Sequence, residues 1–169
     1  MIPKLIITDI DGVWTDGGMY YDQTGNEWKR FNTSDSAGVL FCKLMQIPIA
    51  IITGENTEIV KRRANKLKID FLIQGSKNKL LDAQNICNEL KISIKEVAFI
   101  GDDINDLELL LNVGLSGTTK NAPEYIKRQV QLVTKKKGGD GAFREFIEAI
   151  LSVSENFDYL YKKYLKLEG

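Results

Sequence analysis

The chain has 169 residues, of which 43% are hydrophobic and 27% are charged, and its 23 basic side chains balance its 23 acidic ones. This length suffices for a domain with its own core, and the zero net charge argues against a general nucleic-acid partner. No apolar run approaches the roughly 18 residues of a membrane span, so no membrane partner is expected. Histidine is absent, which excludes histidine-dependent triads and histidine-ligated zinc hydrolases.

Apolar runs that favour β-strands alternate along the chain with segments of helical periodicity. The predicted strands are Leu5–Thr8, Pro48–Thr53, Ile69–Ile73, Val97–Ile100, Val113–Ser116 and Gln131–Val133. Apolar stripes predict helices around residues 37–44, 60–67, 80–90, 107–111 and 143–150, and Ser34 or Asp35 is the expected N-cap of the first helix. Strands this apolar, alternating with helices, predict an α/β fold with a doubly wound, mainly parallel, Rossmann-like sheet.

Two segments depart from this alternation. Residues from about 15 to 31 contain two aromatic-rich stretches around a glycine-containing turn, which predicts an inserted β-hairpin. Its aromatic side chains favour packing against another subunit, and packing within the chain is the alternative. The tail, from about 155 to 169, has apolar residues at helical spacing and is expected either to cover the core or to contact a neighbouring chain. The length suffices for one domain, so residues 1–169 are expected to form a single domain.

The two cysteines, Cys42 and Cys87, lie far apart and lack the spacing of a redox motif or a structural zinc site. Each occupies an apolar position of a predicted helix, so both are expected in the core. The sequence begins directly with a predicted core strand, so no signal peptide is expected. The expected location is the cytoplasm.

The most informative motif is the aspartate pair Asp9 and Asp11, which follows the first predicted strand and precedes Gly12. Residues two apart on an extended chain point to the same side, so the two carboxylates repel each other unless a cation lies beside them. A solvated loop with two acids is the alternative. A calcium-binding helix-loop-helix is excluded because Val13 occupies a ligand position of that loop.

Polar residues also follow the other predicted strands, and the carboxyl ends of parallel strands meet at one edge of a sheet. These residues are Thr53, Gly54, Lys79, Asp102, Asp103 and Asp106. Together with the aspartate pair they supply what the transfer of a phosphoryl group requires. Mg²⁺ prefers oxygen ligands and neutralises phosphate charge, and the carboxylates of Asp9 and Asp102 with the carbonyl of Asp11 are its candidate ligands.

The remaining roles follow from the chemistry of each side chain. Asp9 is ionised at neutral pH without activation and is the candidate nucleophile. Asp11 suits a general acid and base. The Thr53 hydroxyl, nearby backbone N–H groups and the Lys79 ammonium are expected to hold the phosphoryl oxygens. Asp103 or Asp106 is expected to hold Lys79 in place.

These residues occur in four short motifs that together resemble those of a known family. The segments Asp9-x-Asp11-Gly, Thr53-Gly54, Lys79 and Gly101-Asp102-Asp103-x-x-Asp106 resemble, in order and spacing, the four motifs of the haloacid dehalogenase superfamily of phosphatases. The resemblance covers residues 5–106. It implies the haloacid dehalogenase fold, an enzyme that hydrolyses phosphoric monoesters, and the same roles for the residues of the four motifs.

A narrower resemblance covers almost the whole chain. The segments Asp11-Gly-Val-x-Thr-Asp-Gly-Gly, the hairpin, Phe31-Asn32-x-x-Asp35 and Gly138-Gly139-x-Gly141-Ala142-x-Arg144-Glu145 are similar to the small, capless sugar-acid phosphatases. These act on 3-deoxy-D-manno-octulosonate 8-phosphate or 3-deoxy-nonulosonate 9-phosphate. The resemblance implies a homotetramer assembled through the hairpins, with an active site completed by a neighbouring subunit. It gives a role as interface or pocket aromatics to Trp14, Met19, Tyr20, Tyr21 and Trp28. The basic, glycine-rich segment 135–144 is expected to meet the substrate carboxylate from that neighbour.

Local sequence favours the nine-carbon substrate over the eight-carbon one. Glu55 follows Thr53-Gly54 where the octulosonate enzymes usually have a basic residue, and Thr33 and Ser34 replace their Val-Arg. These changes, together with Arg63 and Lys66 in the following helix, resemble the nonulosonate branch. The expected substrate-binding residues are therefore Thr33, Ser34, Gly54, Glu55, Arg63 and Lys66. A non-catalytic oligomerisation partner of a nucleotide-sugar synthetase is the remote alternative, which the complete set of motif acids disfavours.

Overall fold

The computed structural model describes residues 2–152 and 157–166, and its centre is a six-stranded sheet with only parallel pairings. The strand order is β5-β4-β1-β6-β7-β8. Their bounds are Leu5–Thr8 for β1, Ile49–Ile52 for β4, Phe71–Ile73 for β5, Val97–Ile100 for β6, Leu115–Thr118 for β7 and Leu132–Val133 for β8. The chain first builds outward from β1 to β5 and then returns to add strands on the other side of β1. The sheet therefore has its switch point beside β1, where parallel α/β folds form their sites.

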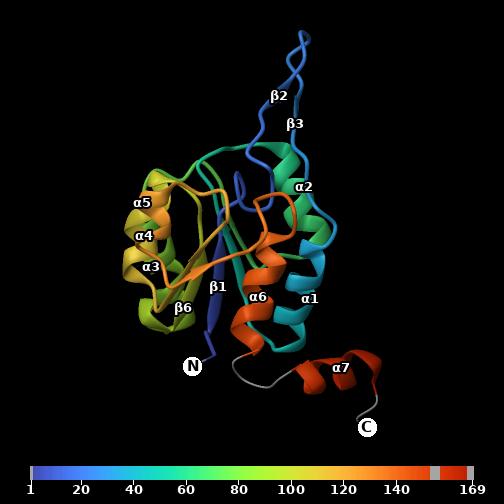
Figure 1. Cartoon of the computed structure of the whole chain (residues 1–169), viewed down its shortest axis with the longest axis vertical. Coiled ribbons are helices and arrows are strands. Elements are labelled where there is room, and N and C mark those ends of the chain that lie inside the picture. The colour runs from blue at the N-terminus through green and yellow to red at the C-terminus, as the bar shows by residue number, and fades with distance from the viewer. Residues whose placement is uncertain (1, 153–156, 167–169) are drawn as a thin grey trace.

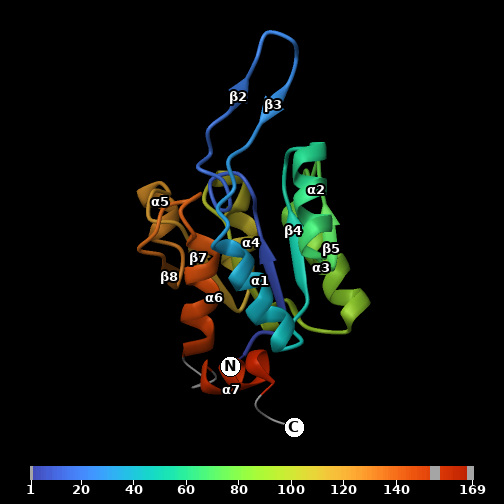
Figure 2. The same cartoon turned by 90° about the vertical axis from the view of Figure 1, so that its right-hand side faces the viewer.

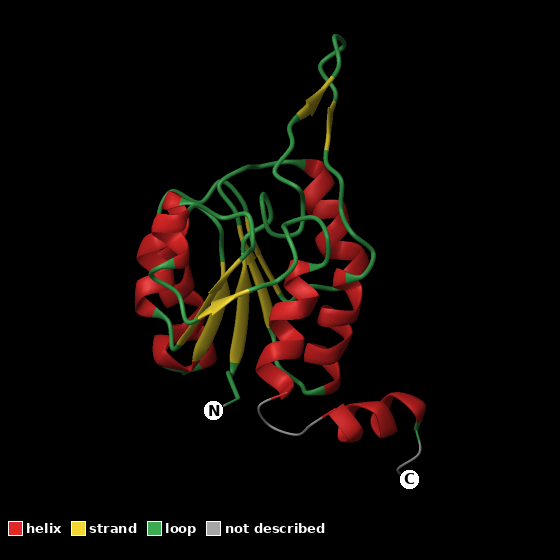
Figure 3. Ribbon diagram, viewed as in Figure 1, coloured by secondary structure: helices red, strands yellow, loops and turns green. Residues whose placement is uncertain are grey.

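Helices cover both faces of the sheet (Figure 1, Figure 3). The α-helices are α1 (Asp35–Leu44), α2 (Glu58–Leu67), α3 (Lys79–Leu90), α4 (Leu107–Asn112), α5 (Glu124–Lys127), α6 (Ala142–Ser152) and α7 (Phe157–Leu165), and the 3₁₀ turns are η1 (Ile94–Glu96) and η2 (Ile104–Asp106). Helices α1, α2 and α6 lie on one face, whereas α3, α4 and α5 lie on the other. Within the described ranges, none of the helices is both long and apolar enough to span a membrane.

Side chains of the central strands alternate between two hydrophobic cores, one on each face of the sheet. On β1, Ile6 packs in the core beneath α1 and α6, while Leu5 and Ile7 pack in the core beneath α3 and α4. All four residues of β1, β4 and β6 are buried, which explains why their sequences are apolar without alternation. Cys42 and Cys87 are both buried, one in each core, as predicted.

Some local predictions are wrong. Strand β7 begins two residues later than predicted, and the short helix α5 was not predicted. Ser34 is the N-cap residue of α1, one of the two predicted candidates, but its side chain makes no capping hydrogen bond. The carboxylate of Asp35 instead accepts a hydrogen bond from the backbone N–H of Arg144, at 3.0 Å, and so joins the start of α1 to the first turn of α6.

The predicted tail helix corresponds to α7, which lies at the end of the molecule opposite the hairpin (Figure 1). Leu160 is buried in the core shared with α1, and the Phe157 ring contacts the Phe41 ring edge-on, 5.9 Å between centroids. This part of the tail therefore covers the core of its own chain. The predicted tail residues 155–156 and 167–169 lie outside the described residues.

The inserted hairpin consists of β2 (Tyr20–Tyr21) and β3 (Glu27–Trp28), which pair antiparallel and project beyond the carboxyl ends of the sheet (Figure 2). Tyr21 and Trp28 are strongly exposed near its tip. Trp14, which the sequence grouped with these interface aromatics, is instead fully buried. Its ring packs on Phe143 at 4.7 Å, and its indole N–H donates to the Thr8 hydroxyl at 2.9 Å. Trp14 is a core residue because the chain turns back over the sheet before the hairpin begins.

Candidate active site

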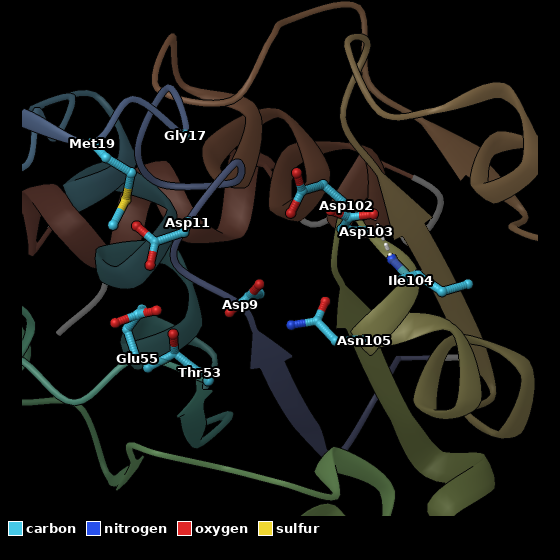
Figure 4. Close-up of a pocket in the computed structure, with 11 residues that line it drawn as sticks. Asp9, Asp11, Gly17, Met19, Thr53, Glu55, Asp102, Asp103, Ile104 and Asn105 are labelled. Carbon is cyan, nitrogen blue, oxygen red and sulfur yellow. Dashed lines mark hydrogen bonds between the residues drawn. The ribbon is translucent and has the colours of Figure 1, made fainter.

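A cavity of about 310 Å³ opens at the carboxyl ends of the central strands (Figure 4). Its walls come from the loops after β1, β4 and β6 and from the base of the hairpin. The lining residues are Asp9, Asp11, Gly17, Met19, Thr53, Gly54, Glu55, Asp102, Asp103, Ile104 and Asn105. In Figure 4, Asp9 lies directly above the end of β1, between Thr53 with Glu55 on one side and Asp102 with Asn105 on the other. One parallel sheet thus brings three distant motifs into one cavity.

Lys79 does not line this cavity, but its ammonium forms ion pairs with two aspartates. Its ammonium is 3.0 Å from Oδ2 of Asp9 and 2.6 Å from Oδ1 of Asp106, and all three side chains are buried. The other oxygen of Asp106 accepts the backbone N–H groups of Asp102 at 2.9 Å and of Asp103 at 3.1 Å. Of the two acids considered for holding Lys79, Asp106 makes the contact. Asp103 instead accepts from the N–H of Ile104.

Three carboxylates lie close together at the cavity. Asp9, Asp102 and Asp106 each offer an oxygen within 4.8 Å of the others. Burial raises the pKa of Asp102 to about 8, and the charges of Asp9 and Asp106 add to this effect. Burial, together with the charge of Asp106, likewise raises the pKa of Asp9 against the opposing charge of Lys79. The cluster therefore favours a cation that restores ionised carboxylates.

Two further observations fit a hard metal ion at this cluster. Oδ1 of Asp9 is buried and has no hydrogen-bond partner among the described residues. Gly12 keeps the loop after β1 close to Asp102, because a Cβ at this position would lie 1.9 Å from Oδ2 of Asp102, and its φ of +82° favours glycine. Carboxylate oxygens are the donors that Mg²⁺ prefers, so the residues present suit this ion.

The two oxygens of the Asp11 carboxylate differ in their hydrogen bonding. Its Oδ1 accepts from the ammonium of Lys29 at 2.7 Å and from the hydroxyl of Thr15 at 3.3 Å. Its Oδ2 is buried without a partner in the described part of the chain. Lys29 comes from the base of the hairpin, eighteen residues away in sequence. This contact could not be predicted from the sequence, because an isolated lysine in a hairpin resembles any solvated lysine.

Four predicted substrate-binding residues do not reach the cavity of their own chain. Thr33 and Ser34 lie just before α1, while Arg63 and Lys66 line a separate hollow of about 610 Å³ on α2. The Arg63 guanidinium is held there, 3.0 Å from the hydroxyl of Ser36 and 5.7 Å from the centre of the Phe31 ring. Gly54 and Glu55 do line the cavity.

The basic, glycine-rich segment 135–144 packs against its own chain. The N–H of Gly139 donates to the carbonyl of Val13 at 3.1 Å. A Cβ on Gly138 would lie 1.8 Å from the carbonyl oxygen of Gly12, so only glycine fits at this contact. The glycines of this segment therefore support the loop that follows Asp9, a role that the sequence prediction of a contact across subunits did not include.

The haloacid dehalogenase-like hydrolase family matches residues 43–146, more than half of the sequence. The chain belongs to this family. Membership confirms the predicted superfamily and the prediction of a hydrolase. The match includes three of the four motifs, and the aspartate pair directly follows β1, the strand that pairs with β4 and β6.

Individual relatives extend the similarity to nearly the whole chain. The 3-deoxy-D-manno-octulosonate 8-phosphate phosphatase of Yersinia pestis is 36% identical over 155 residues, which are 92% of this chain and 83% of the relative. A crystal structure of 3-deoxy-D-manno-octulosonate 8-phosphate phosphatase from Moraxella catarrhalis, in complex with magnesium, phosphate and a KDO molecule, has a TM-score of 0.91 at 36% identity, covering 96% of this chain and 93% of that one.

A probable YrbI family phosphatase from Pseudomonas syringae pv. phaseolica has a TM-score of 0.92 at 40% identity, covering 99% of this chain and 94% of that chain. The predicted fold class, a doubly wound parallel sheet with an inserted hairpin and no cap domain, is therefore confirmed within the described residues.

Proposed function

We propose that this protein is a Mg²⁺-dependent phosphatase that hydrolyses the terminal phosphate of a 3-deoxy-2-keto sugar acid through an aspartyl-phosphate. The observation that carries the proposal is the buried Oδ1 of Asp9, which has no partner in the described chain and lies in the cavity beside Asp102. Asp9, the carbonyl of Asp11 and Asp102 would hold the metal. The ion would supply positive charge to the phosphoryl oxygens.

The reaction has two half-reactions, which are the transfer of the phosphoryl group to Asp9 and the hydrolysis of the aspartyl-phosphate. The Asp9 carboxylate attacks phosphorus, the bond to the sugar oxygen breaks, and Asp11 donates a proton to that oxygen. Asp11 then accepts a proton from water as the water oxygen attacks the aspartyl-phosphate, which releases inorganic phosphate and regenerates Asp9. Thr53 and the N–H of Gly54 hold phosphoryl oxygens, and Lys79 adds positive charge next to the nucleophile.

For the substrate, we propose 3-deoxy-D-manno-octulosonate 8-phosphate. Several similar proteins are named as phosphatases of this eight-carbon ester, and the structure of the Moraxella catarrhalis protein is in complex with magnesium, phosphate and KDO. This support favours the eight-carbon sugar over the nine-carbon one that local sequence had ranked first. The nine-carbon ester, 3-deoxy-nonulosonate 9-phosphate, is the second candidate, because Glu55 lines the cavity and its carboxylate could accept hydrogen bonds from substrate hydroxyls.

Removal of the metal provides a direct test of the proposed cofactor. We expect chelation by EDTA to lower kcat by more than about 100-fold, because the metal supplies several kcal/mol of charge stabilisation. Mg²⁺ added in excess should restore activity. Calorimetric titration with Mg²⁺ should show binding to the wild type, and Asp102→Asn should weaken it. Full turnover after exhaustive chelation, with no measurable Mg²⁺ binding, would contradict the proposed metal site.

We also propose that the protein is a homotetramer whose hairpins meet between subunits and whose neighbouring subunits contribute Arg63 and Lys66. The proposal is supported by the exposure of Tyr21 (66%) and Trp28 (63%) on the projecting hairpin. Light scattering should give about four times the 19.1 kDa chain mass, and the double substitution Tyr21→Asp with Trp28→Asp should lower it. A wild-type monomer at assay concentration would contradict this assembly.

A further inference from the structure

We infer that Lys29 is a positioning residue that fixes the carboxylate of Asp11 for proton transfer; this inference rests on the proposed function. The Lys29 ammonium lies 2.7 Å from Oδ1 of Asp11, and the Lys29 side chain is fully shielded from solvent. A second acid, Glu27, lies 3.3 Å from the same ammonium. Water therefore cannot take the place of this contact, and one cation is shared by two carboxylates.

The contact leaves one oxygen of Asp11 available for chemistry. Lys29 and the hydroxyl of Thr15 both donate hydrogen bonds to Oδ1, so the position of this oxygen is fixed. The other oxygen, Oδ2, is buried and has no partner among the residues that the structure describes. An acid that must give a proton to one leaving oxygen and then take one from water benefits from such a fixed orientation.

The position of Lys29 on the hairpin explains how it reaches Asp11. Successive side chains of an extended strand point to opposite sides. Lys29 accordingly turns inward, whereas Arg30 lies at the surface and pairs with Asp16 at 3.0 Å and with Asp140 at 3.3 Å. These pairs tie the base of the hairpin to the loop after β1 and to the loop before α6. The base of the hairpin is thereby held beside Asp11 within a single chain.

A purely structural role for Lys29, as a tie that holds the hairpin, predicts a different kinetic outcome. A structural defect would slow the enzyme on every substrate. In kcat/KM, which reports the steps up to departure of the leaving group, loss of a positioned acid would instead slow only those esters whose leaving group needs a proton. An alkyl ester such as 3-deoxy-D-manno-octulosonate 8-phosphate needs it, whereas p-nitrophenyl phosphate does not, because p-nitrophenolate is a stable anion.

The experiment compares these two substrates across wild type, Lys29→Met, Lys29→Arg, Asp11→Asn and the control Lys4→Met. Lys4 forms an ion pair of similar length, 2.6 Å to Glu96, at the opposite end of β1. We expect Lys29→Met to lower kcat/KM on the sugar phosphate about 10- to 100-fold and kcat/KM on p-nitrophenyl phosphate about threefold or less. Lys29→Arg should recover much of the loss, and Lys4→Met should match wild type.

Each outcome bears on a separate claim. If Lys29→Met slows both substrates equally while Asp11→Asn slows only the sugar phosphate, the positioning role is overturned and the proposed function stands. If Asp11→Asn shows no selective loss, Asp11 is not the acid, and both the inference and that part of the proposed function fail. Should Lys29→Met fold poorly by circular dichroism, Lys29→Gln, which keeps a donor of similar length, is compared in its place with the same two outcomes.

Discussion

Replacing Asp9 by asparagine is expected to abolish turnover while leaving the fold intact. The substitution removes the nucleophile, so kcat should fall by about 10⁴-fold or more. The fold should survive, because Asp9 is a buried carboxylate whose pKa is raised by burial and by Asp106, so that its ionised form carries a cost in the native state. Phosphate release and thermal unfolding of the same preparation measure the two effects.

The matched control is Asp158→Asn, which makes the same chemical change at an exposed site on α7, opposite the cavity. It should leave both activity and melting temperature unchanged. Trapping provides a second readout, since wild type quenched during turnover should carry phosphate on Asp9 and Asp9→Asn should carry none. Residual activity of Asp9→Asn above about one-tenth of wild type would remove Asp9 as nucleophile.

Replacing Asp106 by alanine is expected to cause the largest loss of stability at the site. Asp106 is completely buried, accepts two backbone N–H groups and holds Lys79 at 2.6 Å. Its removal leaves these donors unpaired and Lys79 with one carboxylate, so the free energy of unfolding should fall by about 3–5 kcal/mol. Turnover should fall about 100-fold, because Lys79 would then shift toward Asp9 and screen the nucleophile. Urea unfolding and steady-state kinetics test the two effects.

Asp106→Asn separates the two functions of this side chain. The amide oxygen can still accept the N–H groups of Asp102 and Asp103, so the loss of stability should be about half that of alanine. The amide carries no charge to hold Lys79, so turnover should fall nearly as far as in Asp106→Ala. Wild-type stability in Asp106→Ala, or full activity in Asp106→Asn, would contradict the arrangement described here.

The sheet and the core of the site were predictable because each depends on short-range pattern and one general rule. Apolar strands alternating with helices predict parallel order, and the carboxyl ends of parallel strands meet at one edge. Asp9, Thr53 and Asp102 follow three such strands, which the structure places side by side in the order β4-β1-β6. Their common location in the cavity therefore follows from their position in the sequence.

The features that were missed depend on how side chains are directed in three dimensions. Trp14 and Trp28 are both aromatic residues near the hairpin, yet one is buried beneath it and the other is exposed on it. Lys29 reaches Asp11 only because the hairpin base folds against the loop after β1. Arg63, a predicted substrate-binding residue, lines a separate hollow on α2, where it contacts Ser36, so any contact with a substrate would have to be made across subunits. Sequence spacing carries no information on such long-range directions.

The proposed function and substrate are tested together by kcat/KM for 3-deoxy-D-manno-octulosonate 8-phosphate beside 3-deoxy-nonulosonate 9-phosphate, with Mg²⁺ present. We expect phosphate release from both esters and a preference of at least about tenfold for the eight-carbon one, or about 1.4 kcal/mol of discrimination in the transition state. A tenfold preference for the nine-carbon ester would contradict the proposed substrate and make Glu55 the first candidate for specificity. No phosphate release from either ester would contradict the proposed function itself.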